Sequence, residues 1–95
     1  QMSYRHIVLF QIHDFVDDER VTEAVERLRS LGVLPGILSW RVELSLDTRK
    51  GRVIVEEASF VDGAAFEAFR EHPEHVKAAR SMAEISDWWI GDYKP

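Results

Sequence analysis

The segment Phe69-Arg-Glu-His-Pro-Glu-His75 holds two of the four histidines, three positions apart and separated by a proline. Pro73 is tolerated only in the first turn of a helix, because it lacks a backbone N–H and its ring clashes with a preceding turn. The segment therefore predicts the end of one helix and the start of another, with His72 as the cap and His75 one turn inside. The positive end of the helix dipole disfavours a protonated imidazole there. His75 is thus a candidate for a neutral side chain that accepts a proton.

Composition excludes several classes of protein. The chain has 95 residues, a formal net charge of −5 and no cysteine. Interspersed acidic and basic residues with a negative balance argue against a nucleic-acid or anionic-membrane partner, and the lack of cysteine excludes disulfides and thiolate chemistry. The longest apolar run, Ile7 to Phe10, is too short for a membrane span or a signal peptide. We therefore expect one cytoplasmic domain covering residues 2–95.

Hydrophobic patterning predicts the elements that would position these histidines. Alternation predicts strands over residues 4–12, 38–46, 52–60 and 88–93. Asp17 and Asp62 are expected to cap two helices, the first ending at Gly32, and another helix should run from Pro73 to about Ile85 with Val76, Ala79, Met82 and Ala83 facing inward. This order predicts an α+β, ferredoxin-like split βαβ fold, with a four-stranded antiparallel sheet and helices on one face.

The other face of that sheet would have no cover of its own. The first strand is apolar on both sides, with Ile7 and Leu9 opposite the face that carries His6. Burial on both sides is expected for such a strand, and a second copy of the chain is the simplest cover. Adjacent Trp88 and Trp89 must point to opposite faces of a regular strand, so at least one should enter the dimer contact.

An RNA-recognition domain is a rival with the same topology. Lys50-Gly51 followed by Val55 resembles the third-strand motif of such domains. That motif needs aromatic rings to stack on bases, and the corresponding positions hold Arg52, Ile54 and Glu57. Nucleic-acid binding is therefore not expected.

Several short motifs together point to a family. They are Tyr4-Arg-His-Ile-Val-Leu-Phe10, Pro35-Gly-Ile-Leu-Ser39, Phe60, His72-Pro-Glu-His75 and Asp92-Tyr93, in this order along nearly the whole chain. In this combination the chain resembles the stress-responsive dimeric α/β-barrel proteins, the Dabb family. The resemblance implies a homodimer whose two sheets pack into a closed barrel with helices outside. Plant members are linked to stress responses, one plant branch cyclises linear polyketides, and related antibiotic-biosynthesis monooxygenases share the architecture.

The resemblance also implies roles for individual residues. In the cyclase branch a histidine in the position of His75 acts as base, beside a tyrosine in the position of Phe69. Residues in the positions of His6 and Asp92 line or orient that site. This chain keeps His75, His6 and Asp92 as candidate catalytic residues, and we expect Asp92 to orient His75. Phe69 lacks the hydroxyl that could hold a substrate oxygen, which puts cyclase activity in doubt.

A small organic ligand is expected to contact Glu56, Phe69 and Ile54. Adjacent Glu56 and Glu57 must face opposite sides of their strand, so one lies on a buried face. A buried carboxylate is uncommon unless it is paired or functional. Pairing with Arg41 or Arg52 on a neighbouring strand is the simpler expectation, and a second acid/base group in the cavity with His6 and His75 is the functional one.

Three functions stay open on the sequence alone. Acid/base chemistry on an enolisable carbonyl compound, of cyclase, isomerase or lyase type, would use His75 as base. In a non-catalytic stress or ligand-binding protein, His75 and His6 would only form hydrogen bonds that organise the core, as most buried polar groups do. A cofactor-free monooxygenase is the third. His72 and His75 could share a metal with Glu71 or Glu74, but no third ligand is evident, so neither a metal nor a cofactor is expected.

Overall fold

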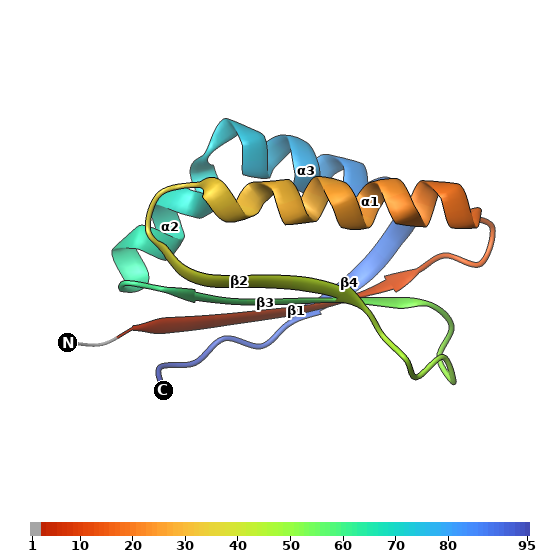
Figure 1. Cartoon of the computed structure of the whole chain (residues 1–95), viewed down its shortest axis with the longest axis horizontal. Coiled ribbons are helices and arrows are strands. Elements are labelled where there is room, and N and C mark those ends of the chain that lie inside the picture. The colour runs from red at the N-terminus through yellow and green to blue at the C-terminus, as the bar shows by residue number, and fades with distance from the viewer. Residues whose placement is uncertain (1–2) are drawn as a thin grey trace.

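The computed structural model describes residues 3–95 and has the ferredoxin-like topology that the sequence predicts. The elements are β1 (Tyr4–Ile12), α1 (Asp18–Ser30), the short 3₁₀ helix η1 (Leu31–Val33), β2 (Ile37–Leu44), β3 (Val53–Phe60), α2 (Gly63–Glu71), α3 (Pro73–Ile85) and β4 (Ser86–Ile90). The strands form one antiparallel sheet in the order β2-β3-β1-β4. The helices all lie on one face of it (Figure 1).

The helices begin where capping side chains satisfy free backbone N–H groups. Asp17 and Asp62 each accept a hydrogen bond of 2.8 Å from the backbone N–H three residues further on. His72 does the same for α3, since its Nδ1 accepts from the backbone N–H of Glu74 at 3.1 Å and Pro73 is the first helical residue. The predicted helix starts, and the break between α2 and α3, are therefore confirmed.

The bounds of three predicted elements are wrong, as is one predicted pattern. Strand β4 covers Ser86–Ile90 instead of residues 88–93. Helix α1 ends at Ser30 and passes into a 3₁₀ turn instead of ending at Gly32. Strand β2 ends at Leu44, and Leu46 is fully exposed in the hairpin. Leu38 is the extra residue of a β-bulge, so it drops out of the strict alternation and lies exposed.

The inner face of α3 is predicted only in part: Met82 is buried and Ala79 lines the cavity beneath the helix, but Ala83 does not face inward. The fully buried residues of this helix are Ala78, Met82 and Ile85, whereas Ala83 is exposed. Both sets fit a helical stripe, because positions three and four apart share a face. The sequence pattern alone does not show whether Ala83 or Ala78 is buried together with Met82. In the folded chain Ala78 is the buried residue.

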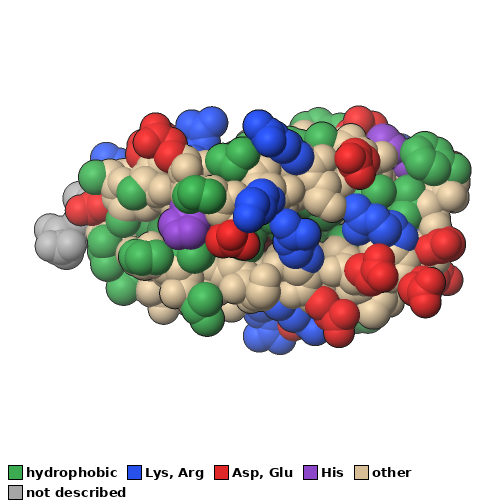
Figure 2. All heavy atoms as spheres, turned by 90° about the horizontal axis from the view of Figure 1, so that it is seen from above, with side chains coloured by type: hydrophobic (Ala, Val, Ile, Leu, Met, Phe, Trp, Pro, Cys, Tyr) green, Lys and Arg blue, Asp and Glu red, His purple; other side chains and the backbone are tan. Residues whose placement is uncertain are grey.

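The core lies between the sheet and the helices. Residues of β1 and β3 that face the helices are buried: His6, Val8, Phe10 and Ile12 on β1, and Ile54, Glu56, Ala58 and Phe60 on β3. Two of these side chains, His6 and Glu56, are polar. Figure 2 views the molecule from the helix-bearing side, where positive and negative side chains are mixed with patches of apolar surface.

The opposite face of the sheet has an apolar patch at its centre that is uncovered in the single chain. Leu9 pairs across the sheet with Val55 on one side and Trp89 on the other. Leu9 is 42% exposed and Trp89 is 61% exposed. Trp88 lies on the other face, where its ring contacts Phe10, so the predicted opposite directions of the two tryptophans are confirmed.

Among residues 3–95, no helix has the length and apolar character needed to cross a bilayer.

Gly36 is a position where the fold requires glycine. Its φ is +86°, and a Cβ there would lie 2.9 Å from the Cβ of Ala65 in α2. We expect Gly36→Ala to lower the free energy of unfolding by about 1–2 kcal/mol, since an L-residue pays roughly that much in left-handed backbone. Chemical denaturation measures this. Gly91→Ala is the control, because a Cβ at Gly91 has no atom within 4 Å; equal effects of both changes would contradict the assignment.

Candidate functional site

A cavity of about 210 Å³ lies between the sheet and the helices. Most of its wall is apolar, and the polar side chains on it are His6, Glu56, Arg70 and His75. They come from β1, β3, α2 and α3 in that order. The apolar wall is formed by Val8, Phe10, Leu28, Leu31, Phe66, Ala78, Ala79, Met82, Trp88 and Ile90.

His6 lies between two carboxylates. Its Nδ1 is 2.8 Å from Oδ1 of Asp92, and its Nε2 is 3.4 Å from Oε2 of Glu56. Glu56 reaches it diagonally, because Ala58 and not Glu56 is the direct cross-strand partner of His6. Burial by itself lowers the pKa of His6, but the two carboxylates outweigh it and the pKa is raised above 6.5. Both ring nitrogens of His6 therefore face carboxylate oxygens, which stabilises the protonated ring relative to an isolated imidazole.

Asp92 is held from three directions. Besides His6, it accepts a hydrogen bond of 2.7 Å from the hydroxyl of Tyr4 and a longer one of 3.4 Å from the backbone N–H of Ile7. The segment that carries it is tied to β1 by reciprocal backbone hydrogen bonds between Arg5 and Tyr93. Burial and the hydrogen bond to Asp92 raise the pKa of Tyr4 to about 12, so Tyr4 remains a donor.

His75 has the opposite electrostatic environment. Its Nδ1 lies 3.0 Å from the backbone carbonyl oxygen of Arg70. A carbonyl only accepts, so Nδ1 carries the proton and Nε2 is the basic nitrogen of the neutral ring. Burial lowers the pKa of His75 and outweighs the hydrogen bond to Arg70 and the charge of Glu56, which raise it; the positive charges of His6 and Arg70 add to the lowering. The ring also packs on Phe69, with a centroid separation of 4.7 Å.

The predicted pairing of Asp92 with His75 is wrong. Asp92 follows β4, which is paired with β1, and it therefore meets His6 on β1. His75 takes its orientation from the backbone at the end of α2 instead. The interruption of the helix at Pro73 brings that backbone beside the first turn of α3.

The expected pairing of Glu56 with an arginine is also wrong. Arg41 lies on β2 and pairs with Glu43 at 3.2 Å, and Arg52 pairs with Asp18 at 2.8 Å. Glu56 faces the cavity, where His6 is its ion-pair partner, whereas Glu57 pairs with Arg5 on the open face of the sheet.

Two of the predicted ligand-binding residues do not line the cavity. Ile54 is completely buried in the core. Phe69 is 2% exposed and packs against Phe60 and Trp40. Both side chains lie in the core between the sheet and the helices, where their neighbours cover them. Phe69 affects the site only through its contact with the ring of His75.

Sequence reasoning missed Tyr4 and Arg70. Tyr4 shares the helix-facing side of β1 with His6, so alternation could have placed both at one site. Arg70 lies inside the Phe69–His75 segment, whose pattern indicates only the end of a helix at this position. In the structure its side chain lines the cavity, and its backbone carbonyl holds His75.

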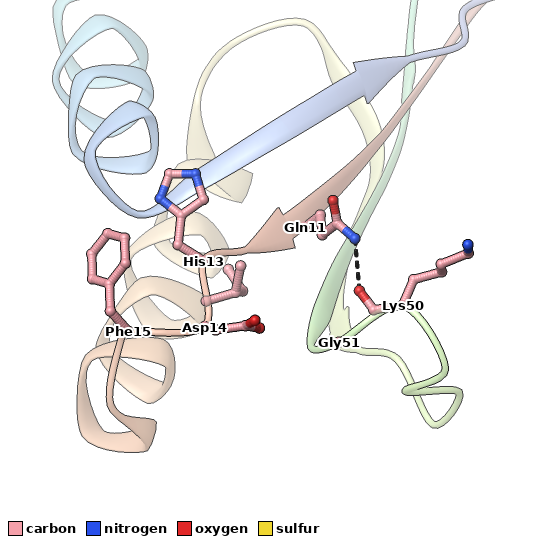
Figure 3. Close-up of a pocket in the computed structure, with 7 residues that line it drawn as sticks. Gln11, His13, Asp14, Phe15, Lys50 and Gly51 are labelled. Atoms are coloured by element: carbon pink, nitrogen blue, oxygen red, sulfur yellow. Dashed lines mark hydrogen bonds between the residues drawn. The ribbon is translucent and has the colours of Figure 1, made fainter.

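A second hollow, of about 510 Å³, lies where β1 ends beside the β2–β3 hairpin (Figure 3). Gln11 donates a hydrogen bond of 2.7 Å to the backbone carbonyl of Lys50 across it. The ammonium group of Lys50 points away from Asp14 and His13, so the charged groups do not converge (Figure 3). A binding site typically has several polar groups that point toward one position in the pocket, and the polar side chains of this hollow do not point toward a common position.

No group of three or more His, Asp or Glu side chains within the described range 3–95 is placed to hold a metal ion. His72 and His75 each use Nδ1 for a separate backbone contact.

Comparisons with known proteins agree with this fold. The profile of the Dabb family, described as the stress responsive A/B barrel domain, matches residues 4–95. The chain belongs to this family. No curated protein matches the chain significantly.

Solved structures of similar fold include both enzymes and proteins of unknown function. A dimeric ferredoxin-like protein of unknown function from Thermobifida fusca has a TM-score of 0.89 and 23% identity, over 99% of this chain and 92% of its own. The hydroxynitrile lyase of Passiflora edulis has a TM-score of 0.84 and 18% identity, over 98% and 93%. SnoaB, a cofactor-independent oxygenase from Streptomyces nogalater, has a TM-score of 0.80 and 18% identity, over 100% and 94%. At these identities the likeness establishes a shared fold.

The two cavity histidines should titrate on opposite sides of 6.5. We expect His6 above and His75 below that value in a pH series of imidazole NMR spectra. Asp92→Asn should lower the pKa of His6. The raised pKa of His6 stabilises the fold below pH 6.5, and this contribution is lost as pH rises through the pKa of the folded state. Asp92→Asn should therefore destabilise the protein more at pH 6 than at pH 9.

Asp87→Asn is the control for this experiment, because Asp87 lies 3.5 Å from His13 and not beside either cavity histidine. Coincident titration of His6 and His75 would contradict the two environments described above.

Proposed function

We propose that the protein is an acid/base enzyme acting on a small enolisable carbonyl compound, with His75 as the base. The observation that carries the proposal is one cavity with two histidines whose pKa values are shifted in opposite directions. Such divergent pairs are typical of sites that divide acid and base roles between two groups.

His75 has the properties required of the base. Its Nδ1–H is fixed on the carbonyl of Arg70, and the neutral ring keeps a lone pair on Nε2. In the proposed step, Nε2 removes a proton from the carbon next to a carbonyl group. Arg70 is also one of the lining residues; in this step its guanidinium, which pairs with Glu67 at 3.3 Å in the structure, turns toward the cavity and stabilises the negative charge that develops on the carbonyl oxygen. Return of the proton to a different atom completes an isomerisation. In a cyclisation the enolate carbon instead forms a bond to a second carbonyl carbon of the same compound, and the resulting alkoxide takes the proton. In a lyase-type reaction the enolate electron pair expels a leaving group from the neighbouring carbon, and the leaving group takes the proton.

The fold neighbours support the general kind of activity without naming a reaction. A hydroxynitrile lyase and a cofactor-independent oxygenase have the same fold. Phenylalanine in place of the cyclase-type tyrosine favours lyase or isomerase chemistry, because the ring of Phe69 that packs on His75 carries no hydroxyl.

A ligand-binding protein without catalysis is the second candidate. The largely apolar cavity wall suits a binding site, and the chain of contacts from Asp92 through His6 to Glu56 would then serve only to organise the core. The two candidates differ in whether His75 exchanges protons with a bound compound.

We also propose that the protein is a homodimer formed through the open face of the sheet. Leu9, Val55 and Trp89 form neighbouring cross-strand pairs on that face, and Leu9 and Trp89 are exposed. Exposed apolar patches of this kind mark interaction surfaces. The Thermobifida fusca protein of similar fold is dimeric.

Proton exchange tests the role of His75 without a known product. Ring-sized aryl ketones are incubated with the protein in D₂O, and loss of the proton signal next to the carbonyl is followed by NMR. We expect His75→Ala to slow this exchange by about 10²–10⁴-fold, the usual contribution of a general base. His13→Ala, remote from the cavity, should leave the rate unchanged. An unchanged rate in His75→Ala would remove the proposed role.

Oligomeric state tests the dimer proposal. Leu9→Glu places a charge in the centre of the open face, and we expect it to convert the protein to a monomer in analytical ultracentrifugation, because an unpaired charge in an apolar contact is strongly unfavourable. Leu46→Glu makes the same change at a fully exposed hairpin position and should leave a dimer. A monomeric wild-type protein would refute the proposal.

A further inference from the structure

Glu56 is an unusual residue to find on the wall of an otherwise apolar cavity. Its side chain is only 4% exposed, and within residues 3–95 its ion-pair partner is His6, at 3.4 Å. A carboxylate has about four lone-pair positions for hydrogen bonds, and one long contact leaves most of them unused. A buried carboxylate is costly unless donors satisfy it, so a ligand in the cavity would gain by supplying a donor.

The charge around Glu56 determines which kind of ligand group fits there. The ring of His6 lies between Asp92 and Glu56, so two carboxylates flank one imidazole and the inner end of the cavity is net negative whether or not that ring is protonated. An anionic group is repelled there. Arg70, the other cationic side chain on the wall, forms an ion pair with Glu67 at 3.3 Å.

The remaining wall argues for a neutral donor over a cation. It consists of aromatic and aliphatic side chains, among them Phe66, Met82 and Trp88. Moving an ammonium group into such surroundings costs far more than moving a hydroxyl group. The volume of about 210 Å³ is below that of a cavity for a drug-sized compound, so the ligand is about the size of one substituted ring.

We propose that the cavity selects a ring-sized compound that carries a hydroxyl group, phenolic or enolic, and that Glu56 is the residue that sets this specificity. The hydroxyl donates to the Glu56 carboxylate while the ring packs on the apolar wall. Calling this compound a substrate depends on the function proposed above, whereas its binding does not. A site built to receive a hydroxyl discriminates against the isostere without it much more strongly than an apolar pocket can.

Calorimetry at pH 7 with a pair of isosteric probes tests the proposal. meta-Hydroxyacetophenone and meta-methylacetophenone differ only in a hydroxyl or a methyl group on the ring. We expect the protein to bind the hydroxyl probe at least about ten-fold more tightly, since a hydrogen bond to a charged group contributes about that factor to an affinity. Glu56→Leu should reverse the preference, and the near-isosteric Glu56→Gln, which keeps an acceptor but loses the charge, should reduce it.

Glu84 provides the matched control. It lies on the exposed side of α3, away from the cavity wall, and Glu84→Gln should leave the preference unchanged. Equal affinity of the wild-type protein for both probes, or no binding of the hydroxyl probe, would overturn the proposal. Tighter binding of benzylamine than of the hydroxyl probe would also overturn it, because Glu56 would then select a cation.

His75→Ala separates this inference from the proposed function. We expect that variant to keep the hydroxyl preference while it loses proton exchange. If proton exchange depends on His75 but the wild-type protein shows no preference for the hydroxyl probe, the proposed role of Glu56 in specificity is refuted and the proposed function stands. If the preference is present and no exchange occurs, the cavity binds hydroxyl compounds and the proposed function fails.

Discussion

The contact between His6 and Asp92 connects the end of the chain to its beginning and organises the cavity. Asp92 lies beyond β4, in a segment that is exposed for most of its length, and the side chains of His6 and Tyr4 bind it to β1. A charge-assisted hydrogen bond of 2.8 Å between partly buried groups is stronger than a neutral one. It fixes the ring of His6, and this ring in turn meets the carboxylate of Glu56. The polar end of the cavity therefore depends on residues from three strands or strand ends that are far apart in sequence.

The break at Pro73 supplies the other half of the site. It ends α2 so that the carbonyl of Arg70 is free of a helical partner and can accept from His75. The same break makes His72 a cap and sets His75 on the first turn of α3. One proline thus determines the tautomer of a histidine two residues away, which is the property that a general base needs.

Local signals were sufficient to predict much of this structure from the sequence. Caps at Asp17, Asp62 and His72 depend on contacts within a few residues, and strand alternation in β1 and β3 depends on burial of one face. The partners of Asp92 and Glu56 depend on strand register and on diagonal contacts, which no short segment encodes. For the same reason the lining of the cavity was only partly predicted: Ile54 and Phe69 lie in the core, where tertiary neighbours enclose them.

Strands β1 and β3 are joined by a diagonal cross-strand ion pair on each face of the sheet, made by the dipeptides Arg5-His6 and Glu56-Glu57. Arg5 meets Glu57 at 3.4 Å on one side, and His6 meets Glu56 at 3.4 Å on the other. Arginine stays protonated at every pH that a cell experiences, whereas imidazole does not. At alkaline pH His6 loses its proton, so the ion pair with Glu56 beneath the helices weakens. The ion pair between Arg5 and Glu57 on the open face persists and keeps the two strands aligned.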